Sequence, residues 1–366
     1  MTVLHRGMRS TGIDGIGQYT KELASRFQLD EELQLLPFTF GGDGRRKPPA
    51  AAYQLPAFAV SAVPALLSSQ PFWGSKQFTQ KVDLVHATDH LIPKCSGVPV
   101  VATIMDAIPL AHPEWVNHRF RALKREIWKK TASFADQIIT ISEHSKSDIV
   151  RFFRIPERRI AVIPLGVDER WFAKPSELLL NQIRRKYQLP ERFFVFVGTL
   201  QPRKNVARII DAHRQLPRFV RQAFPLVIVG RKGWGCEEIE ERLRADDALV
   251  RWLEYVAGDD LPSILRCAFA LVFPSLHEGF GLPVLEAFAS ELPVITSNTT
   301  SLPEVAGDAA ILVDPYDTEC ITEALLLLAE NPSIAQGLRA KGVTRARSFT
   351  WGQTATATKQ IYNNLR

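Results

Sequence analysis

The segment Leu271–Ala289, LVFPSLHEGFGLPVLEAFA, places a short apolar strand, a glycine-rich loop and the start of a helix in direct succession. The strand ends at Phe273, the loop contains Gly279 and Gly281, and Pro283 stands at the start of the helix, where proline is well tolerated. A strand, a loop of this kind and a helix form one unit of a doubly wound α/β sheet. The segment therefore predicts a ligand-binding loop at the carboxyl end of a parallel strand.

Backbone groups of this loop are candidate donors to an anion. The first N–H groups of a helix have no carbonyl partner within the helix, so they point outward and attract a phosphate or diphosphate. Glycines let the backbone approach such a ligand closely, because they carry no side chain. The candidate donors are Gly279, Phe280, Gly281 and Leu282.

Two glutamates flank the loop. Glu278 precedes the glycines, and Glu286 follows in what we expect to be the first helical turn. A carboxylate beside a phosphate loop can accept hydrogen bonds from sugar or ribose hydroxyls, as in dinucleotide-binding folds. Alternatively, Glu286 only complements the helix dipole and Glu278 is a solvated loop acid. The combination of both acids with the glycine loop favours the binding role.

A second loop, VGTLQPRKN at 197–205, presents Arg203 and Lys204 after an apolar run and before a helix expected near Asn205. Arginine binds a diphosphate through paired hydrogen bonds and lysine through its point charge. The same cations would stabilise the charge that develops on a departing diphosphate. The alternative for an Arg–Lys pair taken alone is a solvated surface pair.

Short apolar runs alternate with helical patterns along the chain, which is typical of parallel α/β units. Strand candidates are 34–40, 84–86, 98–104, 137–142 and 159–163 in the first half, and 193–197, 225–229, 249–253, 270–273, 293–296 and 310–313 in the second. We predict an α/β protein with two doubly wound, Rossmann-like domains that face each other across a cleft. The predicted domains are 1–170 and 171–349, with a linker near 166–175 and a last helix, about 350–366, that packs back on the first domain.

Composition fits two soluble domains. The 366 residues exceed the length of about 250–300 at which a single core stops growing. The four cysteines contain no CxxC pair, so neither a zinc site nor a disulfide framework is expected. The N-terminus lacks the apolar region of a secretory signal, and the apolar stretch 48–67 is interrupted by Pro56 and Pro64. We therefore expect a cytoplasmic protein, with peripheral contact to the inner face of a membrane as an option.

The positive charge is concentrated in the first half of the chain. Residues 1–175 hold 23 Lys+Arg against 17 Asp+Glu, whereas 176–366 hold 22 against 22. Helix candidate 119–130, RFRALKREIWKK, combines six cations with apolar residues at helical spacing. Such a helix either rests on an anionic membrane surface or packs its apolar stripe on its own core. No aromatic-interleaved basic patch accompanies the charge, so no nucleic-acid partner is expected.

The first domain contains a third glycine turn. DGIGQYT places Gly15 and Gly17 ahead of a helix expected at 18–27, again with exposed backbone donors. Neither this turn nor GRKGWG at 230–235 matches GxGxxG with a following ribose acid. A nicotinamide dehydrogenase is therefore a poor alternative.

The sequence resembles the retaining GT-B glycosyltransferases of family four, a group that includes bacterial mannosyltransferases of cell-surface polysaccharide assembly. The resemblance extends from GIGQYT at 15–20 to the C-terminal helix. It is most specific in VGTLQPRKN, in HEGFGLPVLEAFA and in TSNTTSLPEVAGDAAILVDP at 296–315. The acids Glu278 and Glu286 match the acidic motif of that family.

The resemblance implies roles for residues of both domains. It places Glu278 on the hydroxyls of the donor sugar, Glu286 on the ribose, the glycine-loop amides on the sugar and phosphate, and Arg203 and Lys204 on the diphosphate. Many members carry a further arginine where Thr199 stands. The remaining matched positions are Val256 beside Tyr255 in the nucleobase slot, and Gly15 and Gly17 facing the donor.

One departure concerns catalysis. Many relatives have a histidine in a TxHD-like segment of the first domain, whereas this chain has TIMDAIPL, with Met105 in that place and Asp106 retained. In the mechanism usually drawn for the family, the leaving phosphate oxygen accepts the proton of the acceptor, so the histidine is not obligatory. His86 or His90 either compensates for the missing side chain or is a buried structural histidine.

The resemblance implies a retaining glycosyltransferase. The expected donor is GDP-mannose, with a UDP-sugar as the alternative, and the expected acceptor is a saccharide or a lipid-linked saccharide. Arg203 and Lys204 can neutralise the leaving group and the sequence contains no DxD motif, so we expect no metal and no cofactor. A nucleotide-sugar epimerase and a catalytically silent nucleotide-sugar-binding protein are the two rivals, the second because of Met105.

Overall fold

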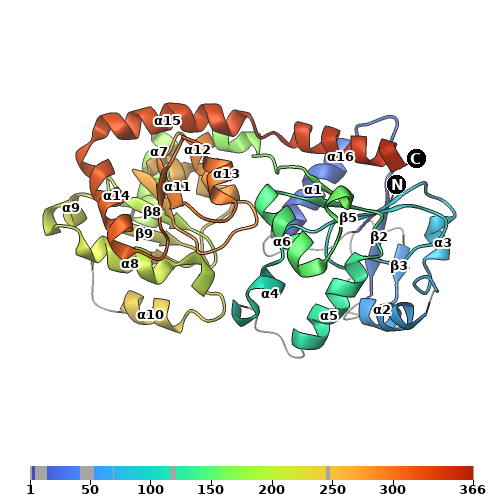
Figure 1. Ribbon diagram of the computed structural model, residues 1–366. Helices are drawn as coiled ribbons and strands as arrows, with labels where there is room; N and C mark the ends of the chain where they lie inside the picture. The colour runs from blue at the N-terminus through green and yellow to red at the C-terminus, as the bar shows by residue number, and fades with distance from the viewer. Residues whose placement is uncertain are drawn as a thin grey trace. The chain divides into compact units, whose positions relative to one another are not determined.

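Runs of three to five mostly apolar residues form the strands of two separate parallel sheets (Figure 1). The computed structural model describes residues 2–4, 15–41, 53–68, 70–115, 121–244 and 248–365. The chain divides into two units: the first contains Met1–Gly166 and Trp351–Arg366, and the second contains Val167–Thr350. The fold is thus α/β with two Rossmann-like halves, as the sequence predicts.

Among the described residues, the sheet of the first unit has seven strands in the order β3-β2-β1-β4-β5-β6-β7, and all of these pairings are parallel. The strands are β1 (Thr2–Leu4), β2 (Leu36–Phe40), β3 (Tyr53–Leu55), β4 (Val85–Ala87), β5 (Val100–Thr103), β6 (Gln137–Thr140) and β7 (Ile160–Val162). Five of them confirm predicted strands to within two residues at each end. Sequence analysis missed β1 and β3, which have three residues each.

The helices of the first unit are α1 (Gly15–Phe27), α2 (Phe58–Leu67), α3 (Lys76–Thr79), α4 (Ile108–Ala111), α5 (Arg121–Ala132), α6 (Glu143–Phe153) and α16 (Trp351–Leu365). The expected turn at Gly15 and Gly17 is wrong: both glycines lie inside the first turn of α1. The helix extends to Gly15 because its buried stripe already includes Gly17 and Tyr19. Residues 119 and 120 of the predicted basic helix lie outside the described residues.

The apolar stretch at 48–67 contributes β3 and α2, and α2 has only ten residues, with Pro64 inside it. Within the described ranges, no helix has the length and apolar character needed to cross a bilayer.

A buried histidine attaches the last helix to the first sheet. His86 on β4 is fully buried, and its Nδ1 lies 2.6 Å from Tyr362 Oη of α16 while its Nε2 lies 2.8 Å from Thr103 Oγ1 of β5. Burial lowers the pKa of His86 to about 3, so the ring is neutral. His86 is therefore a structural histidine. His90 is not buried in the same way: its ring is half-exposed and pairs with the carboxylate of Asp89.

The second sheet has six strands in the order β10-β9-β8-β11-β12-β13. They are β8 (Phe194–Val197), β9 (Leu226–Val229), β10 (Val250–Leu253), β11 (Ala270–Phe273), β12 (Val294–Ser297) and β13 (Ile311–Val313), which confirms all six predictions to within one residue. The strand order reverses between β8 and β11, which pair with each other. In doubly wound sheets, ligands bind at the carboxyl ends of the strands beside such a reversal.

Two groups of helices cover this sheet (Figure 1). α8 packs against α10 and α14, whereas α12 packs against α13 and α15. The helices of the second unit are α7 (Glu177–Tyr187), α8 (Val206–Gln215), α9 (Arg218–Ala223), α10 (Glu237–Arg244), α11 (Leu261–Cys267), α12 (Leu282–Ala289), α13 (Leu302–Ala306), α14 (Thr318–Glu330) and α15 (Pro332–Arg347). The six strands are thus enclosed between two helical layers.

The carboxyl ends of β8 and β9 approach so closely that only glycine fits. Gly230 has φ +152°, and a Cβ atom there would stand 1.9 Å from the carbonyl oxygen of Gly198. The neighbouring atom belongs to the backbone, so no rotamer change can relieve the overlap. This close contact sets the spacing of the loops that follow β8 and β9.

We predict that Gly230→Ala destabilises the protein by more than the roughly 1–3 kcal/mol of backbone strain, because the overlap adds to it. The free energy of unfolding from urea titration measures the effect. Gly337→Ala is the matched control, since its Cβ would meet nothing within 4 Å inside α15. The control should be neutral or stabilising, by up to about 1 kcal/mol. Equal stability of the two variants would contradict the role of Gly230.

Candidate functional site

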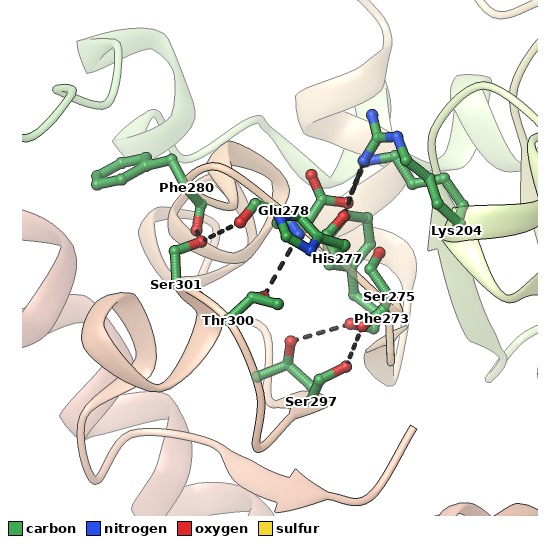
Figure 2. Close-up of polar contacts among 11 residues, drawn as sticks. Lys204, Phe273, Ser275, His277, Glu278, Phe280, Ser297, Thr300 and Ser301 are labelled. Atoms are coloured by element: carbon green, nitrogen blue, oxygen red, sulfur yellow. Dashed lines mark hydrogen bonds and ion pairs between the residues drawn. The ribbon is translucent and has the colours of Figure 1, made fainter. Parts of the chain in front are cut away.

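An ion-pair cluster lies where the order of the second sheet reverses. Glu278 Oε1 lies 2.6 Å from Lys204 Nζ and 3.0 Å from Arg203 NH1 (Figure 2). The two cations come from the loop after β8, and the acid comes from the loop after β11. The parallel pairing of β8 and β11 brings these two loops together. Three residues predicted separately from two motifs thus form one cluster.

Both Lys204 and Glu278 are buried, with exposures of 8% and 7%. Burial raises the pKa of Glu278, but the charges of Arg203 and Lys204 outweigh burial and hold that pKa at about 2. Lys204 Nζ also lies 4.7 Å from the centre of the Phe273 ring, which favours a cation at this position. The cluster is therefore a fixed arrangement of charges, and Glu278 is not a solvated loop acid.

The cations are held by the local backbone. Arg203 and Lys204 lie in a 3₁₀ turn, Pro202–Lys204, that ends at Asn205 with φ +61°. The Asn205 Nδ2 donates to the carbonyl oxygens of Pro274, at 2.9 Å, and Pro315, at 2.7 Å. Arg203 NH1 also donates to the carbonyl of His277, at 3.1 Å. The first loop is thus bonded directly to the second.

Hydroxyl groups at the end of β12 support the glycine loop (Figure 2). Ser301 Oγ lies 2.9 Å from the carbonyl oxygens of both Glu278 and Phe280. Thr300 Oγ1 accepts a hydrogen bond of 3.3 Å from the N–H of Glu278, and Ser297 Oγ donates to the carbonyl of Ser275. Sequence analysis missed this support. The hydroxyl-rich run TSNTTS at 296–301, directly after a predicted strand, was the available signal.

The glycine loop leads into α12 as predicted. Gly281 precedes the helix with φ +115°, and a Cβ there would stand 2.7 Å from Leu302 Cδ2. Pro283 lies in the first turn, and no described side chain caps this helix end. Phe280 is buried, and its ring lies 5.9 Å from that of Phe349 in an edge-to-face contact. The loop is therefore rigid, and the N-terminus of α12 opens at Gly281.

Glu286 is the fifth residue of α12 and not, as expected, part of its first turn. The helix begins at Leu282, so Glu286 belongs to its second turn and does not complement the helix dipole there. The prediction of a first-turn position is wrong because it counted the helix from Pro283. Burial raises the pKa of this half-buried carboxyl to about 7, against the charge of Arg170. Near neutral pH the group can therefore donate as well as accept hydrogen bonds.

Other predicted donor-site residues also lie at carboxyl ends of the second sheet. Thr199 is exposed after β8, and Val256 is half-buried after β10. Next to Val256, the ring of Tyr255 is 65% exposed and the Arg231 guanidinium lies 5.3 Å from its centre. An exposed aromatic ring of this kind can stack on a nucleobase.

Three predicted residues belong to the first unit, namely Gly15, Gly17 and Asp106. Asp106 follows β5, and its Oδ1 accepts a hydrogen bond of 3.0 Å from the N–H of Ile108 at the start of α4. Met105, beside it, is half-buried. The structure thus groups Arg203, Lys204 and Glu278 with the glycine loop in the second unit. The three residues of the first unit are not part of that group.

The two Rossmann-like units have the GT-B fold, which matching solved structures share. The family model described as Glycosyltransferase Family 4 matches residues 13–171, and the model described as Glycosyl transferases group 1 matches residues 181–348. The chain therefore belongs to the glycosyltransferases that these two family models describe.

Relatives within the family include named mannosyltransferases. The O-antigen chain mannosyltransferase B of Escherichia coli is 30% identical to this chain in an alignment 374 residues long. The alignment covers 96% of this chain and 97% of that protein. The serotype-specific mannosyltransferase WbdA of Escherichia coli is 31% identical over 265 residues, which cover 70% of this chain but only 32% of that longer protein.

The fold has close counterparts among solved structures. HepE from Anabaena, solved in complex with UDP, matches with a TM-score of 0.75 at 17% identity, and the match covers 100% of this chain and 99% of that one. The similarity at this identity concerns the fold.

We predict that Lys204→Ala lowers turnover by roughly 10²–10³, because the variant loses one preorganised cation of the pair that the family resemblance assigns to the diphosphate. Steady-state sugar transfer measures the effect. Lys186→Ala is the control, since Lys186 is exposed and pairs with Asp260 at 2.6 Å, outside the cluster. Unchanged turnover in the Lys204 variant would remove this lysine from the reaction.

Proposed function

We propose that this protein is a retaining mannosyltransferase that transfers mannose from GDP-mannose to a saccharide or a lipid-linked saccharide. The observation that carries the proposal is the cluster of Arg203, Lys204 and Glu278 beside the glycine loop. It combines cations for a diphosphate with an acid for sugar hydroxyls. The mannosyltransferase names of the relatives support the choice of sugar.

The donor binds to the second unit in this proposal. Arg203, Lys204 and the amides of Gly279–Leu282 hold the diphosphate, Glu278 and Glu286 bind the sugar and ribose hydroxyls, and Val256 contacts the base beside Tyr255. As the bond to the diphosphate breaks, an oxocarbenium-like sugar forms, and the two cations stabilise the leaving oxygen. That oxygen takes the proton of the acceptor hydroxyl, which attacks from the same face. The configuration at the anomeric carbon is then retained.

The acceptor binds to the first unit in this proposal, where Asp106 is the candidate catalytic residue. Gly15 and Gly17, in the first turn of α1, remain candidate contacts of the donor, as the family resemblance implies. The charge that needs stabilisation lies on the leaving diphosphate. Because Arg203 and Lys204 can supply that stabilisation, we propose that the reaction requires no metal and no further cofactor.

We predict that GDP and GDP-mannose stabilise the protein in a thermal-shift screen of nucleoside diphosphates and their sugars. A ligand at 100 times its dissociation constant adds about 2.7 kcal/mol to the free energy of unfolding. With an acceptor saccharide, GDP-mannose should then yield a product of unchanged anomeric configuration by NMR. Stabilisation by UDP compounds alone would identify a UDP-sugar donor instead.

Product analysis alongside the screen separates the rivals. Binding without transfer and without slow donor hydrolysis would identify a silent binding protein. Conversion of the donor sugar in the absence of acceptor would identify an epimerase. Stabilisation by no nucleotide at all would contradict the proposal as a whole.

We also propose peripheral contact with an anionic membrane through α2 and α5. The outer face of α2 is apolar, with Val60, Val63 and Leu67 exposed, and α5 packs beside it. Ile127 of α5 contacts the apolar cluster under α2, and Leu123, one turn earlier on the same stripe, is 62% exposed. Lysines and arginines surround this stripe on α5. Apolar side chains bordered by cations fit a surface of anionic lipid.

Leu67→Glu should therefore reduce co-sedimentation with phosphatidylglycerol vesicles several-fold, because it places an acid on the apolar face. Leu29→Glu is a matched control, since Leu29 and Leu67 are both 86% exposed and Leu29 lies beyond the end of α1. Equal binding by both variants, or equal binding to phosphatidylcholine vesicles, would contradict a membrane contact of this kind.

A further inference from the structure

Glu278 occupies the position where the proposed diphosphate would meet its cations. A single carboxylate oxygen, Oε1, contacts both Lys204 Nζ, at 2.6 Å, and Arg203 NH1, at 3.0 Å (Figure 2). Carboxylates and phosphates bind arginine and lysine through the same charge-assisted hydrogen bonds. An acid of the protein itself therefore holds the two cations.

This acid stays charged and in place under physiological conditions. The pKa of Glu278 is about 2, so the carboxylate is ionised at neutral pH. Its backbone is fixed on both sides, because its N–H donates to Thr300 Oγ1 and its carbonyl oxygen lies 2.9 Å from Ser301 Oγ. A competing anion can therefore separate the carboxylate from the cations only through movement of these charged side chains, not through movement of the Glu278 backbone.

A displaced carboxylate needs new hydrogen-bond donors. Glu278 is 7% exposed, and a buried charge that loses its partners carries a large desolvation penalty. The hydroxyls of a donor sugar can supply these hydrogen bonds. A nucleoside diphosphate without its sugar cannot supply them, and it also places its negative charge beside that of the carboxylate.

We propose that Glu278 determines the specificity of the site for the intact nucleotide sugar over the bare nucleoside diphosphate, by competing with the diphosphate for Lys204 and Arg203. This inference rests on the proposed function. The intact donor frees Glu278 from the cations and gives it sugar hydroxyls in exchange. After transfer the sugar is gone, the carboxylate returns to the cations, and the nucleoside diphosphate leaves. The same residue thus favours binding of the substrate and release of the product.

Isothermal titration of Glu278→Gln with GDP and with GDP-mannose tests the inference, and UDP and UDP-glucose serve as a second ligand pair. Glutamine keeps the shape of the side chain but removes the competing charge. We expect GDP to bind about tenfold more tightly than to the wild type, because a like-charge contact is lost. The affinity for GDP-mannose should not rise, so the preference for the sugar-bearing ligand falls by at least the same factor.

Glu291→Gln is the matched control. Glu291, just beyond the end of α12, pairs with Lys174 at 3.1 Å and Arg266 at 3.2 Å, so the variant removes the same charge from another ion-pair cluster of this unit. Its affinities for both ligands should equal those of the wild type. A similar gain in this variant would show that net charge alone is responsible and would overturn the inference.

Weaker GDP binding by Glu278→Gln, or an unchanged ratio of the two affinities, would also overturn the inference. If the glutamine variant does not fold, Glu278→Asp replaces it, since it keeps the charge that Lys204 needs but is too short to contact both cations. GDP should bind this variant several-fold more tightly than the wild type, and equal binding would again overturn the inference. A wild type that binds no nucleotide of either pair would instead contradict the proposed function.

Discussion

A carboxylate shared between two cations holds the two central loops of the second unit together. Glu278 and Lys204 are 74 positions apart in the sequence, yet their side chains meet because β8 and β11 are parallel neighbours. A buried charge is stable only when it is paired and hydrogen-bonded, so each member of the cluster constrains the other two. The shape of the site depends on this contact.

Hydrogen bonds to backbone groups hold the loops around the cluster. The hydroxyls of Ser297, Thr300 and Ser301 hold the backbone of the glycine loop, and Asn205 fixes the turn that carries the cations. The close approach at Gly230 sets the edge of the sheet beside them. These contacts use backbone groups, so the charged side chains are the main parts of the site that are free to respond to a ligand.

The two loops could be predicted because glycine, proline and charged residues follow apolar runs at fixed offsets. The link between the loops could not, since it depends on which strands become neighbours in the sheet. The support from Ser301 depends in the same way on the register of β11 and β12. β1 and β3 were not predicted, and Glu286 was assigned to the first turn of its helix because helix ends vary by a residue or two. The sequence pattern therefore predicts the two motifs, whereas the strand order of the sheet determines that they meet.

The attachment of α16 through Tyr362 and His86 affects the order of folding during synthesis. The ribosome completes the second unit, Val167–Thr350, before it makes the helix that finishes the first unit. Until then His86 and Thr103 lack the Tyr362 side of their hydrogen-bonded chain, and Tyr19 and Phe27 of α1 lack the aromatic rings of α16 that they contact. The first unit therefore completes its packing only after the second unit has been synthesised, although its strands are translated first.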